Sequence, residues 1–147
     1  MKLIVHTDGG ARGNPGPAAV GVVIESVIGS SLIDHGKAKR IIEFGKAIGE
    51  TTNNVAEYTG VIEALKKMKD LRLKMKEVQF YLDSMLVVNQ INGLFKVKDA
   101  KLRELLTQVR LLEQEIGGDI RYTSIPRALN SKADALVNKA LDIGIKI

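Results

Sequence analysis

The sequence predicts an α/β domain: a five-stranded mixed sheet flanked by helices, with the elements in the order βββαβααβα. Five short runs rich in apolar and β-branched residues have the length of strands, and four longer stretches have the pattern of helices. The first three runs follow one another through short connections, which is typical of antiparallel strands. Helices separate the last two runs from the others, which favours two parallel strands. Because 147 residues suit one core, we expect a single domain over residues 1–147.

Local signals set the boundaries of each element. A Gly/Pro cluster follows the first strand, Thr and Asn residues open the first helix, and glycines end the second and third helices. The last seven residues, 141–147, are largely apolar apart from Asp142 and Lys146, and they predict a strand or extended segment that packs on the body, with a contact to a second copy as the alternative. The expected strands cover residues 2–8, 18–28, 40–50, 76–83 and 119–126, and the expected helices cover residues 51–71, 84–93, 99–118 and 130–144.

Composition excludes several classes of function. There is no cysteine, so disulfides and thiolate metal sites are excluded. No apolar run approaches the ~18 residues that a membrane span needs, and the start lacks the layout of a signal peptide, so we expect a cytoplasmic protein. The net charge of +5 fits a polyanionic partner. Aromatic residues make up only 4 % of the chain, which argues against a single-strand binder that stacks bases.

Four acidic residues occur where elements meet. Asp8 and Asp83 end the first and fourth strands, and Glu57 and Asp134 lie in the first turns of the first and last helices. Each has a local explanation. Asp8 would support an Asx-turn, Asp83 would cap the next helix, and the two helical acids would complete capping boxes that begin at Asn54 and Ser131.

The spacing around the two helical acids favours a different interpretation. Glu57 shares a helix face with four apolar residues at offsets of 4, 7, 8 and 11, and Asp134 shares one with apolar residues at offsets of 3 and 7. Those faces should pack on the sheet, and a buried carboxylate must be paired, protonated or bound to metal. If the first and fourth strands are neighbours, Asp8 and Asp83 lie side by side. Together the acids predict a site for hard divalent cations such as Mg²⁺ or Mn²⁺.

Four motifs follow one another along essentially the whole chain: TDGGARGNPGPAAVG, TTNNVAEYTGVIEAL, LDSMLVVNQING and PRALNSKADALVNKAL. Taken in this order, they resemble ribonuclease H of type 1. The resemblance implies an RNase H-like fold and an endonuclease that cuts the RNA strand of RNA–DNA hybrids, leaving 3′-hydroxyl and 5′-phosphate ends. It also implies that Asp8, Glu57, Asp83 and Asp134 are catalytic residues that hold two Mg²⁺ ions, with Mn²⁺ as a possible substitute. We expect a monomer that acts on the hybrid, with RNA–RNA duplexes as a further substrate.

The same resemblance predicts the residues that contact the substrate. Glycine-rich backbone after Asp8 would approach the RNA strand and contact its 2′-hydroxyl groups, and asparagines would reach sugars and base edges in the minor groove. The predicted substrate-binding residues are Gly9, Gly10, Ala11, Arg12, Asn14, Asn53, Asn54, Ser84 and Arg127.

The sequence departs from the family pattern in two places. Arg127 stands near the position where well-known bacterial members have a loop histidine; it is suited to contact a phosphate but not to act as a base. His6 is expected to be a sheet residue, and Asn130 to order the loop or, as the alternative, to form a hydrogen bond near the metal. The basic protrusion of some members is missing, and the predicted substitute is a phosphate-binding surface made of Lys96, Lys98, Lys101 and Arg103.

Two other classes of function remain as alternatives. A 3′ exonuclease on a related fold would carry a second acid two residues after the first, but that position is Gly10. A module that binds hybrids without cutting them would not need all four acids, yet all four are present.

Overall fold

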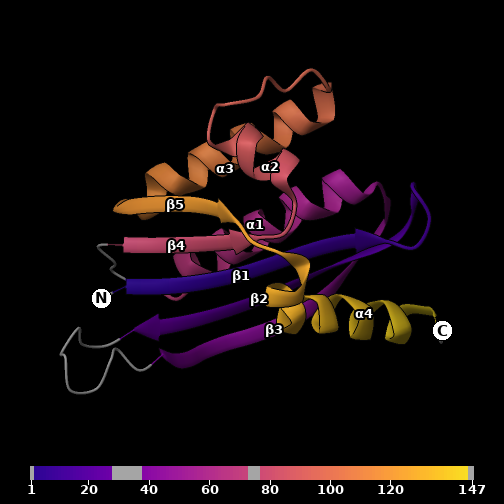
Figure 1. Ribbon diagram of the computed structural model, residues 1–147, viewed down its shortest axis with the longest axis horizontal. Coiled ribbons are helices and arrows are strands. Elements are labelled where there is room, and N and C mark those ends of the chain that lie inside the picture. Colours follow the sequence, from indigo (N-terminus) through magenta and orange to yellow (C-terminus); the bar gives the residue numbers. More distant parts are fainter. Residues whose placement is uncertain (1, 28–37, 73–76, 146–147) are drawn as a thin grey trace.

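In the computed structural model, which describes residues 2–27, 38–72 and 77–145, five strands form one mixed sheet (Figure 1). β1 pairs antiparallel with β2 and parallel with β4, β3 extends the sheet antiparallel beside β2, and β5 lies parallel to β4. The predicted mixed sheet is therefore confirmed, with strand order β3-β2-β1-β4-β5. The strands are β1 (Lys2–Ala11), β2 (Gly16–Val27), β3 (Ala38–Thr51), β4 (Glu77–Leu82) and β5 (Asp119–Ser124).

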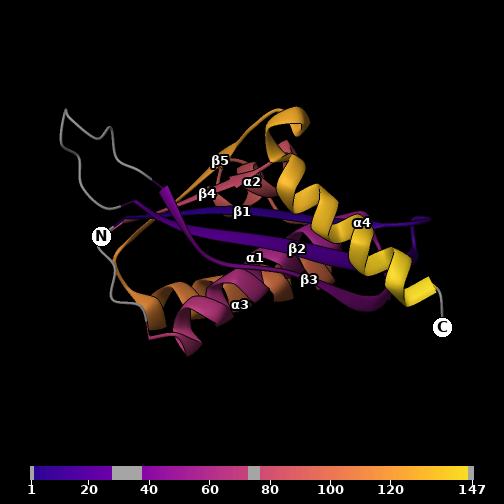
Figure 2. The same ribbon diagram turned by 90° about the horizontal axis from the view of Figure 1, so that it is seen from below.

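The helices cover both faces of the sheet. Figure 2 shows α1 and α3 on one face and α4 on the opposite face. The main core lies between the sheet and α1, α2 and α3, and a smaller apolar cluster of Ala19, Val137 and Leu141 lies under α4. No helix in the described ranges is long and apolar enough to span a membrane. The helices are α1 (Asn53–Asp70), α2 (Met85–Ile91), α3 (Ala100–Ile116) and α4 (Ser131–Ile145), the last preceded by the 3-10 turn η1 (Arg127–Asn130).

β1 continues past Asp8, contrary to the prediction that it ends there. Gly9, Gly10 and Ala11 stay paired with β2. The parallel pairing with β4 ends earlier, at His6 and Tyr81. At Asp8, β1 is therefore still paired with β2 on one side but no longer with β4 on the other. The Asx-turn explanation for this residue is wrong.

The predicted caps also differ from those in the structure. Thr52 is the N-cap of α1, since its hydroxyl accepts a hydrogen bond from the Val55 N–H at 3.3 Å, so Asn54 and Glu57 do not form a capping box. Ser84 rather than Asp83 caps α2, and its hydroxyl accepts from the Val87 N–H at 3.3 Å. Two of the local explanations for acidic residues are thereby removed.

The end of the chain is helical rather than extended, as far as the structure describes it. α4 runs to Ile145, and residues 146–147 lie outside the described ranges. Leu141 is buried one turn after the buried Val137, so the same apolar stripe continues the helix, whereas Ile143 is exposed. The extended segment predicted for residues 141–147 is therefore wrong up to Ile145, whereas the helix predicted over residues 130–144 is confirmed.

Two glycines let helices lie directly on the sheet. A Cβ atom on Gly9 would be 2.2 Å from the backbone of Ala56 in α1, and one on Gly21 would be 2.2 Å from the carbonyl oxygen of Ala133 in α4. Any side chain at either position would push the helix away. Gly9 therefore has a packing role that the sequence did not reveal: it brings α1 against β1 beside Asp8.

Candidate active site

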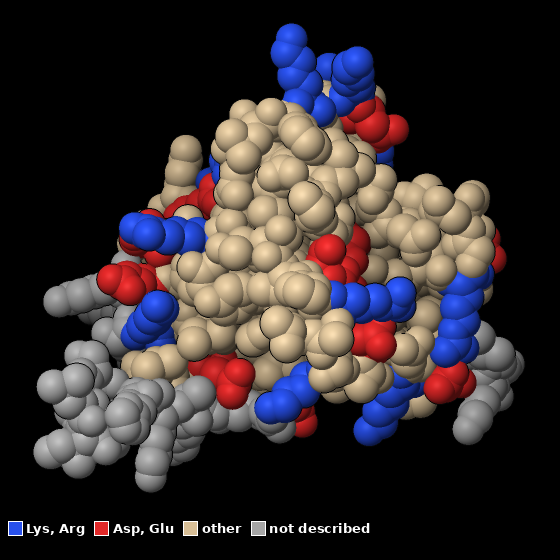
Figure 3. All heavy atoms as spheres, viewed as in Figure 1, with Lys and Arg blue, Asp and Glu red and all other residues tan. Residues whose placement is uncertain are grey.

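Three of the predicted acids meet at one end of the sheet. Asp8 in β1, Glu57 in α1 and Asp83, which directly follows β4, each offer an oxygen atom, and these atoms lie within 4.8 Å of one another. The parallel pairing of β1 with β4 places the two aspartates side by side. The close approach of α1 at Gly9 brings Glu57 to the same point. Figure 3 shows acidic and basic side chains adjoining in the region where β1, β4 and α4 meet.

Burial makes this cluster costly in its ionised form. Burial raises the pKa of Asp8 to about 6, and repulsion from Asp83 and Asp134 adds to the increase. Burial also raises the pKa of Glu57 well above its usual range, with the charge of Asp8 as the next cause. Within the described residues, Asp8, Glu57 and Asp83 form no ion pair with lysine or arginine.

The donor set fits a divalent cation. Glu57 Oε2 is buried and has no hydrogen-bond partner among the described residues, whereas Asp8 Oδ1 accepts a bond from the Gly9 N–H at 2.9 Å. A buried carboxylate oxygen without a partner is destabilising unless a ligand binds it. Carboxylate oxygens are the ligands that Mg²⁺ and Mn²⁺ prefer, so these three residues are suited to hold such an ion.

Asp134 lies in the same cavity but outside the tight cluster. The cavity has a volume of about 330 Å³, and Asp8, Glu57, Asp83, Arg127 and Asp134 all line it. The Asp134 carboxylate is 3.6 Å from Arg127 Nη2 and accepts a bond from Asn138 Nδ2 at 3.4 Å. Its side chain is one-third exposed, whereas Asp8 and Glu57 are buried.

Asparagine side chains connect the β1–β2 turn to the start of α1. The Asn53 N–H donates to Asn14 Oδ1 at 3.0 Å, and the Ala11 N–H donates to Asn53 Oδ1 at 2.9 Å. Both side-chain oxygens therefore accept backbone hydrogen bonds, and the amide NH₂ groups are the parts available to donate. The sequence motif indicated a role for these residues but not this polarity, because it depends on which backbone N–H lies opposite.

Asn14, Asn53 and Asn54 also line a second, larger hollow of about 560 Å³. Its opposite side is formed by the start of α3, where Lys101 is exposed. Three other members of the predicted phosphate-binding surface, Lys96, Lys98 and Arg103, are exposed on the α2–α3 connection and on α3. The asparagines and Lys101 thus share one hollow, beside the acidic cavity that Asn53 also lines.

Asn130 links the turn before α4 to β1 and to the end of β4. Its Nδ2 atom donates to the carbonyl oxygen of Thr7 at 2.9 Å and lies 3.4 Å from Asp83 Oδ2. The predicted loop-ordering role thus has a direct structural counterpart. Asn130 is 1 % exposed, and its Oδ1 atom has no partner within the described chain.

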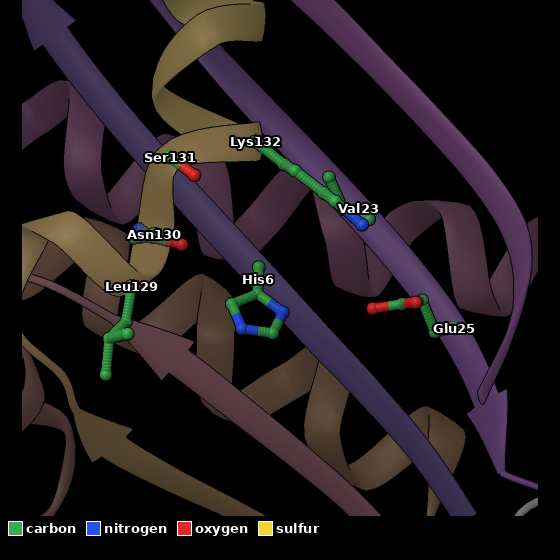
Figure 4. Close-up of a pocket in the computed structure, with 7 residues that line it drawn as sticks. All are labelled: His6, Val23, Glu25, Leu129, Asn130, Ser131 and Lys132. Carbon is green, nitrogen blue, oxygen red and sulfur yellow. The ribbon is translucent and has the colours of Figure 1, made fainter. Parts of the chain in front are cut away.

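A separate pocket of about 200 Å³ adjoins Asn130 on the α4 face of the sheet (Figure 4). His6 lies in this pocket with Glu25 and Lys132, and its ring centroid is 5.3 Å from that of Tyr81. Burial lowers the pKa of His6. His6 is thus a residue of the sheet, as expected, and it does not line the cavity of the acids.

The remaining predicted substrate residues surround the acids. Gly9, Gly10, Ala11 and Arg12 line the cavity, and Ser84 follows Asp83 directly. Gly10 faces Val137 of α4 at an ordinary contact distance, since a Cβ atom there would be 3.8 Å from Cγ1 of Val137. Gly9 is buried and packs tightly on α1. This packing by itself explains why the residue is a glycine, without any contact with RNA.

Comparison with known proteins agrees with this geometry. A family model described as reverse transcriptase-like matches residues 6–140. The chain is 40 % identical over 142 residues to the bifunctional protein Rv2228c of Mycobacterium tuberculosis, a match that covers 97 % of this chain and 36 % of the relative. The chain therefore spans about a third of the length of that curated relative.

Two solved structures are similar over nearly their whole length. RNase H1 from Halobacterium salinarum has a TM-score of 0.84 and 38 % identity, covering 97 % of this chain and 98 % of that one. LC11-RNase H1, solved in complex with an RNA/DNA hybrid, has a TM-score of 0.84 and 39 % identity, covering 97 % and 99 %. On the family model, these two neighbours and the shared strand order, the chain belongs to the type 1 ribonuclease H family.

Proposed function

We propose that this chain is an endoribonuclease that hydrolyses the RNA strand of RNA–DNA hybrids and leaves 3′-hydroxyl and 5′-phosphate ends. The observation that carries the proposal is the cluster of Asp8, Glu57 and Asp83, whose oxygens lie within 4.8 Å of one another. A relative of 39 % identity was solved with an RNA/DNA hybrid bound, which supports this substrate. Family membership and the acidic cavity support the reaction class.

The proposed cofactor is Mg²⁺, two ions per site, with Mn²⁺ as a substitute. Asp8, Glu57 and Asp83 would hold the ions, and Asp134 would complete the coordination of one of them. When bound, such ions lower the pKa of a water and stabilise charge on the attacking and leaving oxygens of a phosphodiester. The partnerless Glu57 Oε2 supports this assignment, because a cation would satisfy it.

The chain's own residues position the site and bind the substrate. Asn130 holds the turn before α4 against Thr7 and beside Asp83, and α4, with Asp134 in its first turn, begins directly after this contact. The NH₂ groups of Asn14 and Asn53 donate to acceptors in the minor groove of the hybrid, since their oxygens accept backbone N–H groups. Arg127 binds a phosphate near the acids, and its lasting positive charge rules it out as a base.

The proposal is tested with end-labelled RNA–DNA hybrid and the matching RNA–RNA duplex, each in Mg²⁺, in Mn²⁺ and in EDTA. We expect internal cuts in the RNA strand of the hybrid, with 3′-hydroxyl ends, that disappear in EDTA and in Asp8→Asn protein. Cutting of the RNA–RNA duplex would widen the substrate class. Tight binding without cutting in either metal would replace this proposal with the binding-module alternative.

A further inference from the structure

Two cationic side chains line the cavity of the acids, and each forms an ion pair with a carboxylate of α4. Arg127 Nη2 is 3.6 Å from Asp134, which the proposed function uses. Arg12 Nη2 is 2.7 Å from Oδ1 of Asp142, which the proposed function leaves without a role. Asp134 and Asp142 are eight residues apart on α4, with Asn138 between them, so the helix presents a polar stripe alongside the cavity.

The Arg12–Asp142 pair is accessible to an exchanging anion. The Arg12 side chain is 39 % exposed and the Asp142 side chain 58 % exposed, so both are in contact with water. An exposed pair of this kind contributes little to stability and is held in a shallow energy minimum. The backbone of Arg12 is fixed, because its N–H donates to the carbonyl oxygen of Pro17 at 2.8 Å. The side chain can therefore change partner while the turn keeps its position.

The guanidinium of Arg12 is better suited to a phosphate than to the single carboxylate contact that it makes in the structure. One terminal nitrogen makes the recorded bond, whereas a guanidinium offers five N–H donors in a planar fork that suits bidentate phosphate binding. Arg12 follows the glycine-rich part of β1 and lines the same cavity as Asp8 and Asp83. A nucleic-acid strand bound along this cavity therefore has both the acids and Arg12 within the surface that it covers.

We propose that Asp142 competes with a backbone phosphate of the bound nucleic acid for Arg12, and so limits affinity and speeds release of the cut strand. The phosphate replaces the carboxylate on the guanidinium, and Asp142 then remains as a negative charge beside the phosphate. This inference rests on the proposed function for the identity of the strand. We expect Asp142 to act through its charge and not through the stability of the fold, because its ion pair is exposed.

The test measures binding of a fluorescein-labelled RNA–DNA hybrid in EDTA by anisotropy. We expect Asp142→Asn to tighten binding about fivefold at low salt, because binding no longer has to break a pair of unit charges about 4 Å apart in water. The gain should shrink as salt rises, because screening weakens the Arg12–Asp142 ion pair that binding must break. Arg12→Ala should weaken binding, and Asp142→Asn should change little in the Arg12→Ala background.

A matched control is the Asp119→Asn variant. Asp119 also pairs with an arginine, Arg121, at 3.0 Å on the surface, at the start of β5 and away from the cavity. It changes the net charge by the same amount, so a similar tightening in Asp119→Asn would mean that only overall charge matters. Weaker binding by Asp142→Asn, or an equal gain in the Arg12→Ala background, would overturn the proposal.

The binding assay also separates this inference from the proposed function. Cleavage by the parent protein with no affinity change in Asp142→Asn would contradict the competition alone. Arg12-dependent tightening in a protein that cuts no hybrid would support the competition while the nuclease proposal fails. Faster multiple-turnover cleavage by Asp142→Asn at saturating hybrid would contradict the part of the proposal that concerns release.

Discussion

Two groups of buried polar side chains differ in how completely they are satisfied. Between α1, α2, α3 and β5, the Tyr58 hydroxyl donates to Gln90 at 2.8 Å, and the Tyr122 hydroxyl donates to Glu113 at 2.9 Å, which Arg110 also pairs with. At the acid cluster, carboxylates face one another and Glu57 Oε2 has no partner among the described residues. The first group stabilises the fold by itself, whereas the second destabilises the fold when its carboxylates are ionised and no cation is bound.

The largest expected effect comes from Asp8→Asn. Cleavage should fall by at least about 10³-fold, because a carboxylate that holds the cation is lost. Stability of the metal-free protein at pH 7 should rise by about 2 kcal/mol, since ionisation of Asp8 is unfavourable in the folded state. Cleavage assays and urea unfolding in EDTA measure the two quantities. Loss of both activity and stability would mean that Asp8 belongs with the satisfied group.

The pH dependence of that gain follows from the raised pKa of Asp8. The folded protein holds the proton up to a pKa of about 6, against 3.8 when Asp8 is exposed. The parent therefore loses stability as the pH rises through this window, whereas Asp8→Asn does not. We expect the advantage of Asp8→Asn to be small at about pH 4 and fully developed above about pH 6. If the stability advantage of Asp8→Asn stayed constant across this pH range, ionisation of Asp8 would not be the cause of the destabilisation.

Metal addition should reverse the order of stability. Mg²⁺ at 100 times its dissociation constant stabilises a one-site protein by about 2.7 kcal/mol, provided that the unfolded chain does not bind it. We expect the melting temperature of the parent to rise with Mg²⁺, and that of Asp8→Asn to rise much less. Ca²⁺, which also prefers oxygen ligands, is tested as a second ion, and NaCl of equal ionic strength is the control for screening. Equal shifts in both proteins would place the bound ion elsewhere.

A smaller effect is expected at the asparagines beside the cavity. In Asn53→Asp, the carboxylate can still accept the bond from the Ala11 N–H, but the NH₂ donor is replaced by a negative oxygen. Hybrid affinity should fall by about tenfold, because one hydrogen bond to the nucleic acid is lost and a negative charge is added beside it. The melting temperature should change little. Binding in EDTA and thermal unfolding are the measurements. Unchanged affinity would restrict Asn53 to a structural role.

The smallest expected effect lies in the satisfied group. Tyr58→Phe removes one hydroxyl and leaves Gln90 Oε1 without its donor, which should cost about 1–2 kcal/mol of unfolding free energy. Cleavage per folded molecule should stay within about twofold, because Tyr58 does not line the cavity. Asp8→Asn changes activity far more than stability, and Tyr58→Phe should do the opposite. A large loss of activity in folded Tyr58→Phe protein would blur the distinction between the two groups.

Most of the fold was predictable because its signals are local. Each strand run and helix stretch has its own periodicity, and the Gly117 end of α3 and the Thr52 start of α1 lie within three residues of the predicted boundaries. The misplaced features depend on neighbours. β1 extends past Asp8 because β2 continues to pair with it. Residues 141–145 continue the helix predicted over 130–144, rather than forming the extended tail that was also predicted, because Leu141 finds an apolar site on the sheet.

The sequence by itself determined which residues have the chemistry for the site: four acids, a glycine-rich strand, a pair of asparagines and a chain of net charge +5. Only the tertiary structure decided how they are arranged. It brings Asp8, Glu57 and Asp83 together, leaves Asp134 at the edge of the cavity, and pairs Arg12 with Asp142 across 130 residues. The physical reason is that residue type is encoded locally, whereas charge repulsion, burial and ion pairing depend on distances that only the packing of β1, β4, α1 and α4 sets.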